Sequence, residues 1–132
     1  MNVALIDSHP VFRAGLRILL KSSFNNLNTL ESGCMQSFKK AIAPGTADII
    51  IIGLSEEEPE INTGVLKQMI GRNPSASFIL YYAHNPGYEL ASSLMRIGVK
   101  GFLSKNGCPG DLEICVNSIL SGRPYICRQL QR

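Results

Sequence analysis

Four consecutive isoleucines at residues 49–52 constrain the fold more than any other feature of the chain. A strand with one face in water alternates apolar and polar residues. This run does not alternate, which is typical of a strand covered on both faces, and such strands belong to parallel sheets that lie between layers of helices. The run therefore predicts a central strand, at residues 48–52, of a parallel α/β sheet.

Strand and helix patterns alternate along the rest of the chain. Pro10 stands where a helix begins, and Pro44, Gly71 and Pro74 stand where helices end. The expected strands are at residues 2–6, 27–31, 48–52, 78–82 and 100–103, and the expected helices are at residues 10–21, 35–43, 63–70, 88–97 and 110–121. Right-handed crossovers then give an α/β domain with a five-stranded, parallel, doubly wound sheet.

Length and composition place this sheet in one small domain. The chain has 132 residues, and we expect residues 1–123 to form the domain and residues 124–132 to begin a linker to a possible further domain. No apolar run approaches the roughly 20 residues of a membrane span, and no signal peptide precedes the first strand, so we expect a cytoplasmic protein. A net charge of +3 without a run of basic residues does not indicate nucleic-acid binding by this domain.

The cysteines predict neither a metal site nor a redox site. Cys34, Cys108, Cys115 and Cys127 have no C-x-x-C spacing and no neighbouring pair of histidines. We therefore expect reduced thiols, no metal and no cofactor. The sequence also lacks a phosphate-binding glycine loop, a dinucleotide fingerprint and a nucleophile–base pair, so we expect no enzymatic activity.

Ligand sites in such sheets lie beyond the carboxyl ends of the strands, where the strand order reverses. In this chain the strands end at Asp7-Ser8, at Gly53, at Tyr82 and, just beyond the fifth strand, at Lys105. These residues come from distant parts of the sequence. The parallel arrangement predicts that they meet at one crevice.

A resemblance to a known family begins at residues 6–16, which read IDSHPVFRAGL. This stretch resembles the opening of response-regulator receiver domains of the NarL/LuxR type, and the resemblance extends over residues 2–123. The resemblance implies that the doubly wound sheet is of the flavodoxin and CheY-like type. In the family pattern, two acidic residues follow the first strand, a phosphorylated aspartate ends the third, a threonine or serine ends the fourth, and a lysine follows the fifth. Asp7 and Lys105 match this pattern. Ser8, Gly53 and Tyr82 depart from it, and Ala83 takes the fourth-strand position if the loop is counted one residue differently.

The resemblance thus implies a degenerate phosphorylation site made of Asp7, Ser8, Gly53, Tyr82 and Lys105, with no catalytic residue. Glycine cannot form an acyl phosphate, and Asp7 alone remains as a carboxylate ligand for the Mg²⁺ that phosphoryl transfer uses. Lys105 is expected to pair with Asp7 or to cap the site, or else to keep the phosphate-sensing role of the family's lysine. The ring of Tyr82 is expected to fill the vacated space.

We therefore expect a phosphorylation-independent pseudo-receiver, the regulatory domain of a bacterial transcriptional regulator that acts through dimerisation or protein interaction. The alternative is a receiver-like domain that senses a small ligand or anion in the vacated crevice. The expected partner is a second copy of the chain, with DNA reached only through a possible C-terminal helix-turn-helix domain and no membrane involved. Two dimer surfaces stay open: helices 88–97 and 110–121 together, or the first and last helices together.

Overall fold

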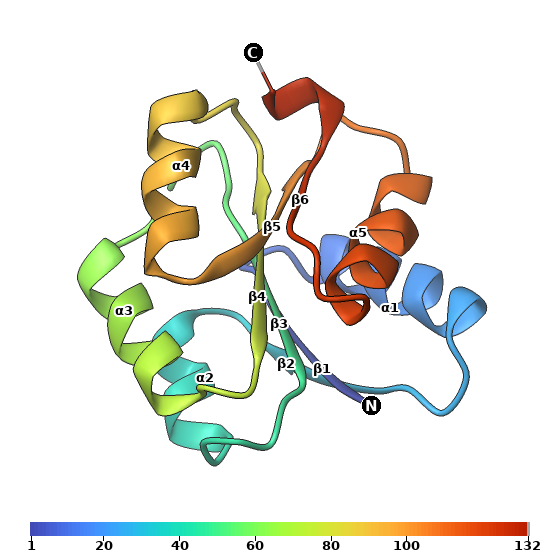
Figure 1. Cartoon of the computed structure of the whole chain (residues 1–132). Coiled ribbons are helices and arrows are strands. Elements are labelled where there is room, and N and C mark those ends of the chain that lie inside the picture. Colours follow the sequence, from blue (N-terminus) through green and yellow to red (C-terminus); the bar gives the residue numbers. More distant parts are fainter. Residues whose placement is uncertain (132) are drawn as a thin grey trace.

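The computed structural model describes residues 1–131 and contains a six-stranded parallel sheet with strand order β2-β1-β3-β4-β5-β6 (Figure 1). The strands are β1 (Asn2–Ile6), β2 (Asn28–Ser32), β3 (Ile49–Gly53), β4 (Ser77–Tyr82), β5 (Val99–Ser104) and β6 (Tyr125–Ile126). The helices are α1 (Pro10–Ser23), α2 (Met35–Ala41), α3 (Thr63–Arg72), α4 (Tyr88–Ile97) and α5 (Gly110–Leu120), followed by the short 3-10 helix η1 (Arg128–Leu130). The predicted parallel doubly wound sheet is confirmed, but its strand number is corrected from five to six.

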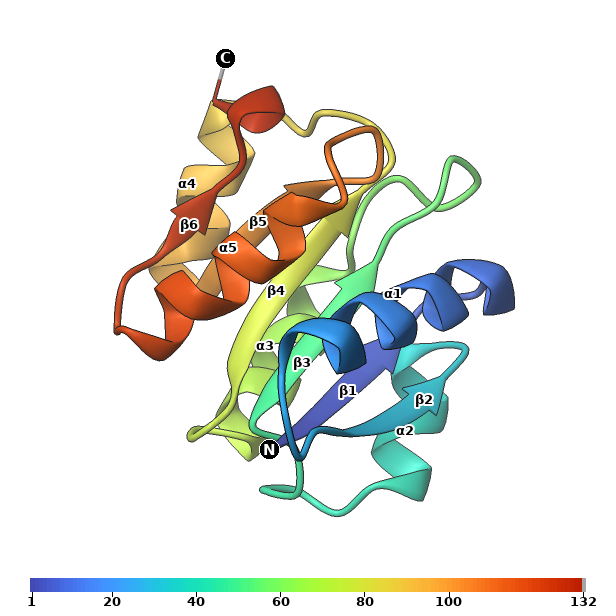
Figure 2. The ribbon, with the colours of Figure 1, turned by 90° about the vertical axis from the view of Figure 1, so that its right-hand side faces the viewer.

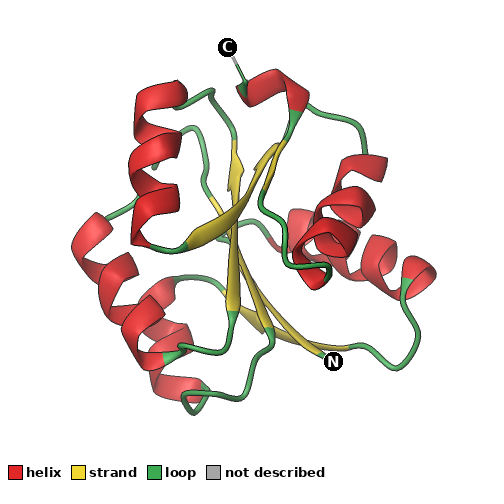
Figure 3. Ribbon diagram, in the orientation of Figure 1, coloured by secondary structure: helices red, strands yellow, loops and turns green. Residues whose placement is uncertain are grey.

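The sheet lies between two layers of helices. Helices α1 and α5 cover one face, and α2, α3 and α4 cover the other (Figures 1 and 3). The four isoleucines of β3 are almost completely buried between these layers, as the absence of alternation predicted. Strand order reverses between β1 and β3, so the crevice expected of such a fold lies beyond the ends of these two strands.

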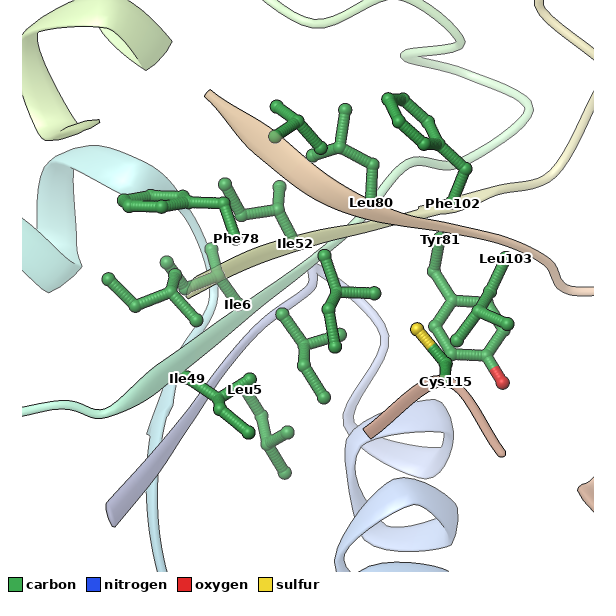
Figure 4. Close-up of a cluster of buried hydrophobic side chains, with 14 of the residues drawn as sticks. Leu5, Ile6, Ile49, Ile52, Phe78, Leu80, Tyr81, Phe102, Leu103 and Cys115 are labelled. Atoms are coloured by element: carbon green, nitrogen blue, oxygen red, sulfur yellow. The ribbon is translucent and has the colours of Figure 1, made fainter. Parts of the chain in front are cut away.

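Successive side chains of each strand point to opposite faces, which sorts the core into two clusters (Figure 4). Phe78 and Leu80 of β4 contribute to the cluster on the side of α3 and α4, together with Ile52 and Phe102. Tyr81 lies on the other face, near Cys115 of α5. The same alternation decides which residues beyond the strand ends can face the crevice.

Residues 125–130 fold onto the edge of the sheet, and this corrects the linker that the sequence predicts from residue 124 onward. Tyr125 and Ile126 pair in parallel with Gly101 and Phe102 of β5 (Figure 2). Cys127 and Leu130 are buried at 0% and 1% exposure, and the Asn85 side chain donates a 3.1 Å hydrogen bond to the Gln129 carbonyl. A two-residue strand is too short to produce a periodic pattern, so β6 could not be predicted from the sequence.

None of the helices within residues 1–131 is long and apolar enough to cross a membrane.

Replacing Leu130 with alanine tests whether this C-terminal segment is part of the domain. Leu130→Ala removes a fully buried side chain and should lower the free energy of unfolding by about 2 kcal/mol. The exposed neighbour Arg128 is the control, because Arg128→Ala should change stability by no more than about 0.5 kcal/mol. Urea denaturation measures both, and equal stabilities of the two variants would show that the segment does not support the fold.

Candidate functional site

The centre of the crevice is an ion pair between Asp7 and Lys105. Asp7 follows β1 and Lys105 follows β5, and the Lys105 ammonium Nζ lies 2.8 Å from the Asp7 carboxylate Oδ2. The Asp7 side chain is 2% exposed and that of Lys105 is 16% exposed. Of the alternatives left open for Lys105, the structure shows the pairing with Asp7. Because the Asp7 carboxylate already balances the charge of Lys105, the attraction of Lys105 for another anion is weak.

The other carboxylate oxygen of Asp7 fixes the start of α1. Asp7 Oδ1 accepts a 2.7 Å hydrogen bond from the His9 backbone N–H and lies 3.2 Å from His9 Nδ1. The Arg13 guanidinium donates to the Asp7 carbonyl oxygen, and Arg13 and Arg17 both pair with Glu31 of β2. These two arginines, four residues apart on α1, therefore join the helix to β2.

Gly53 provides the space that the Asp7 carboxylate occupies. A Cβ atom built on Gly53 would lie 1.8 Å from Asp7 Oδ2, far inside van der Waals contact. Gly53 does not have a positive φ, so the backbone there is open to other residues and only the packing excludes them. Asp7 thus lies where a side chain at the end of β3 would begin.

An aromatic pair lies on the other side of Lys105. The Lys105 ammonium stands 4.3 Å from the centre of the Phe12 ring, within the range of a cation–π contact. Phe12 in turn meets Tyr81 edge to face, with ring centroids 5.2 Å apart. The position of Phe12 in the sequence does not signal this contact, because Lys105 follows β5 and lies far away along the chain.

Tyr82 does not enter the crevice, which corrects the expectation that its ring fills the vacated space. Its side chain points to the α3 and α4 face, is 1% exposed, and has a hydroxyl without a hydrogen-bond partner among the described residues. Burial raises the pKa of Tyr82 to about 12. Ala83 instead lines the crevice beside Lys105 and His9, as the alternative count of the loop allowed.

A cavity of about 240 Å³ adjoins Asp7 and Gly53 on the side of α2 and α3. Exposed Ser8 lies at this cavity, together with Cys34, Glu58 and Glu60. A hydrogen bond with the Ser37 side chain lowers the pKa of the Cys34 thiol. The charged residues of the lining are all acidic, whereas the lysine expected to attract an anion is bonded to Asp7 outside it.

The structure brings Asp7, Gly53 and Lys105 into one site, places Ser8 at its rim, and buries Tyr82 under α3 and α4, outside the lining of the cavity. Within residues 1–131, no group of three or more histidine, cysteine or acidic side chains is arranged to hold a metal ion. The site contains one carboxylate, that of Asp7, which is paired with the Lys105 ammonium, and it has no side chain at the end of β3.

Comparison with known proteins shows similar sequences among bacterial regulators, although no protein-family model matches the chain. The chain is 25% identical over 130 residues to the response regulator UvrY of Escherichia coli K12, which covers 98% of this chain and 59% of UvrY. It is 24% identical over 126 residues to the transcriptional activator protein ExaE of Pseudomonas putida, which covers 96% of this chain and 58% of ExaE. The chain thus spans about three fifths of the length of these relatives.

Solved structures share the fold over almost the whole chain. The isolated REC domain of RcsB from Salmonella enterica, determined with phosphomimetic BeF3−, superimposes with a TM-score of 0.84 at 22% identity and covers 100% of this chain and 96% of that domain. A LuxR-family response regulator from Aurantimonas gives a TM-score of 0.77 at 19% identity and covers 98% and 91% of the two chains. The chain therefore has the fold of these receiver domains, and its sequence is similar to that of response regulators.

Gly53→Ala tests whether the glycine is needed for the position of Asp7. The added methyl group would displace the Asp7 carboxylate and weaken its bond to Lys105, so we expect a loss of roughly 1–3 kcal/mol in the free energy of unfolding. In an Asp7→Ser background the same change should cost less, because the obstructing carboxylate is gone. Urea denaturation of the parent chain and the three variants in this cycle gives both values.

Gly71 provides the control for this cycle. It lies in α3 with open space around its Cβ position, so Gly71→Ala should be neutral or stabilising by up to about 1 kcal/mol. A Gly53→Ala protein as stable as the Gly71→Ala protein would contradict the steric role of Gly53.

Proposed function

We propose that this chain is a phosphorylation-independent pseudo-receiver, the regulatory domain of a bacterial transcriptional regulator, that works by association and not by catalysis. The observation that carries the proposal is the placement of the Asp7 carboxylate in the space beside Gly53, where it pairs with Lys105. This arrangement keeps one conformation of the site without a phosphoryl group. In this proposal the domain acts in the cytoplasm and reaches DNA only through a separate domain.

The chemistry of phosphoryl transfer supports this proposal. An aspartyl phosphate requires a carboxylate nucleophile, and Gly53 has no side chain. Mg²⁺ binds through carboxylates and phosphate oxygens. Asp7 is the one acidic side chain at the strand ends, and both of its oxygens already accept hydrogen bonds or an ion pair. Ser8 offers a neutral hydroxyl where a second carboxylate would be needed.

A domain that is not switched by phosphorylation can still regulate by binding another protein molecule. We propose that this domain forms a homodimer. Symmetric two-fold dimers are the commonest assemblies of soluble homo-oligomers. Sedimentation velocity at tens of micromolar, a concentration that populates weak dimers, should show a dimer with no phosphodonor present. A monomer under these conditions would contradict dimerisation.

Treatment with acetyl phosphate and Mg²⁺ tests the loss of phosphorylation. We expect intact-mass spectrometry to show no added phosphoryl group, because no carboxylate is free to accept it. The isolated REC domain of RcsB, whose structure was determined with phosphomimetic BeF3−, is the control treated in parallel. A labile addition of one phosphoryl group on the present chain would contradict the proposal.

The cavity of about 240 Å³ beside Gly53 favours a second candidate, a receiver-like domain that senses a small ligand. Because Asp7, Glu58 and Glu60 line the cavity and Lys105 does not, a neutral or cationic ligand suits it better than an anion. Native mass spectrometry of the protein purified from its host would detect such a ligand as a bound mass that denaturation releases. A protein of unliganded mass, with a dimer in sedimentation, would favour the pseudo-receiver.

A further inference from the structure

The cavity of about 240 Å³ beside Gly53 has an apolar floor. Ile52 of β3 and Ile61, just before α3, are buried at 2% and 9% exposure, and the half-buried Val65 of α3 completes this floor. An engineered protein cavity of about 150 Å³ holds a benzene ring, whereas pockets for drug-sized ligands begin at about 300 Å³. The cavity therefore has room for a small ligand with a compact apolar body.

The rim of the same cavity is acidic. Glu58 and Glu60 lie in its lining, are exposed, and make no ion pair within residues 1–131. The buried Ser55 hydroxyl accepts a 3.0 Å hydrogen bond from the Glu58 backbone N–H, which ties the acidic loop to the end of β3. No lysine, arginine or histidine is among the described residues that line the cavity. A cation that enters the cavity would therefore meet two carboxylates without a counter-charge.

Two helices begin at the cavity, and their partial charges oppose those of the glutamates. The residues before α2 and α3, Cys34 and Asn62, lie in the lining, and each side chain already accepts a hydrogen bond from the first turn of its helix. A helix N-terminus has about half a positive charge, which favours an anion. Glu58 and Glu60 contribute two full negative charges, so the negative sign prevails and a cation is favoured.

The apolar floor distinguishes an organic cation from a metal ion. Ca²⁺ and Mg²⁺ bind to six or more oxygen atoms. Within residues 1–131, no three histidine, cysteine or acidic side chains are grouped to hold a metal ion, and the apolar floor supplies no oxygen ligand. An organic cation uses both parts of the cavity, because its apolar body covers the floor while its charge stays at the rim.

We propose that this cavity binds a small organic cation, namely a protonated primary amine on a compact apolar body. The inference rests on the second candidate function above, the sensing of a small ligand, and names the class of that ligand. The ammonium group lies between Glu58 and Glu60, and the apolar body packs on Ile52, Ile61 and Val65.

Calorimetric titration with three compounds of similar shape tests the charge of the ligand. Benzylamine should bind at least tenfold more tightly than benzyl alcohol, and benzoate should not bind. The double variant Glu58→Gln/Glu60→Gln should lower the affinity for benzylamine about tenfold and leave the affinity for benzyl alcohol unchanged.

The same loop provides the matched control. Glu56 and Glu57 line the neighbouring crevice with His9 and Lys105 and do not line this cavity. Glu56→Gln/Glu57→Gln should therefore change the affinity for benzylamine less than twofold. Equal losses in the two double variants would show a general attraction to the acidic loop and would contradict the site.

The Cys34 thiol reports where the amine binds. Cys34 lines the cavity, whereas the exposed Cys108 lies outside it, and Cys115 and Cys127 are buried. Saturating benzylamine at neutral pH should slow the labelling of Cys34 by N-ethylmaleimide severalfold and leave the labelling of Cys108 unchanged, as measured by peptide mass spectrometry. Equal rates of Cys34 labelling with and without benzylamine would place the amine elsewhere and overturn the site.

The outcomes separate the ligand class from the function on which it rests. Tighter binding of benzyl alcohol or benzoate than of benzylamine, with protection of Cys34, would overturn the cationic ligand and keep the ligand sensor. If none of the three compounds binds or protects Cys34, both the cationic ligand and the ligand sensor are overturned. The pseudo-receiver is independent of these results, because treatment with acetyl phosphate tests it.

Discussion

The ion pair between the buried Asp7 carboxylate and the partly buried Lys105 ammonium organises the site and much of the surrounding structure. Taking a charge out of water is costly, and the loss of Lys105 would leave the Asp7 carboxylate buried without its partner. The hydrogen bond from the His9 backbone N–H and the ion pair with Lys105 offset the free energy of burying the Asp7 carboxylate. The pair therefore joins the ends of β1 and β5 to the start of α1, and these three elements keep one relative position.

Gly53 has two consequences that follow from one missing side chain. Its lack of a carboxylate removes the nucleophile for an aspartyl phosphate. Its lack of a Cβ atom gives the Asp7 oxygen the space in which it meets Lys105. An aspartate introduced at position 53 would place its Cβ atom against the Asp7 carboxylate, so the packing of the site now requires a glycine there. At Gly53, where the chain departs from the receiver pattern, the Asp7 carboxylate therefore fills the space and no empty gap is left.

Much of the fold could be predicted from sequence because the strongest patterns are local. The isoleucine run, the helix breakers and the alternation of elements gave the parallel sheet, and they placed Asp7, Gly53 and Lys105 at one edge. Strand β6 was not predicted because two residues are too few to show the alternation of side chains that identifies a strand. The position of Tyr82 was misjudged because a shift of one residue at a strand end moves a side chain to the other face. The contact between Lys105 and Phe12 joins distant parts of the chain, so no local pattern could predict it.

The Asp7–Lys105 site also reaches helix α1, through contacts at two places near the start of the helix. The His9 backbone N–H donates to the Asp7 carboxylate, and the Phe12 ring lies 4.3 Å from the Lys105 ammonium. Lys105 and Phe12 also line a groove of about 310 Å³ between α1 and the β5–α5 loop. Because the Asp7–Lys105 pair forms without an added group, these contacts join the start of α1 to the ends of β1 and β5. The proposed function depends on this arrangement, since it requires α1 to keep its place without a phosphoryl group.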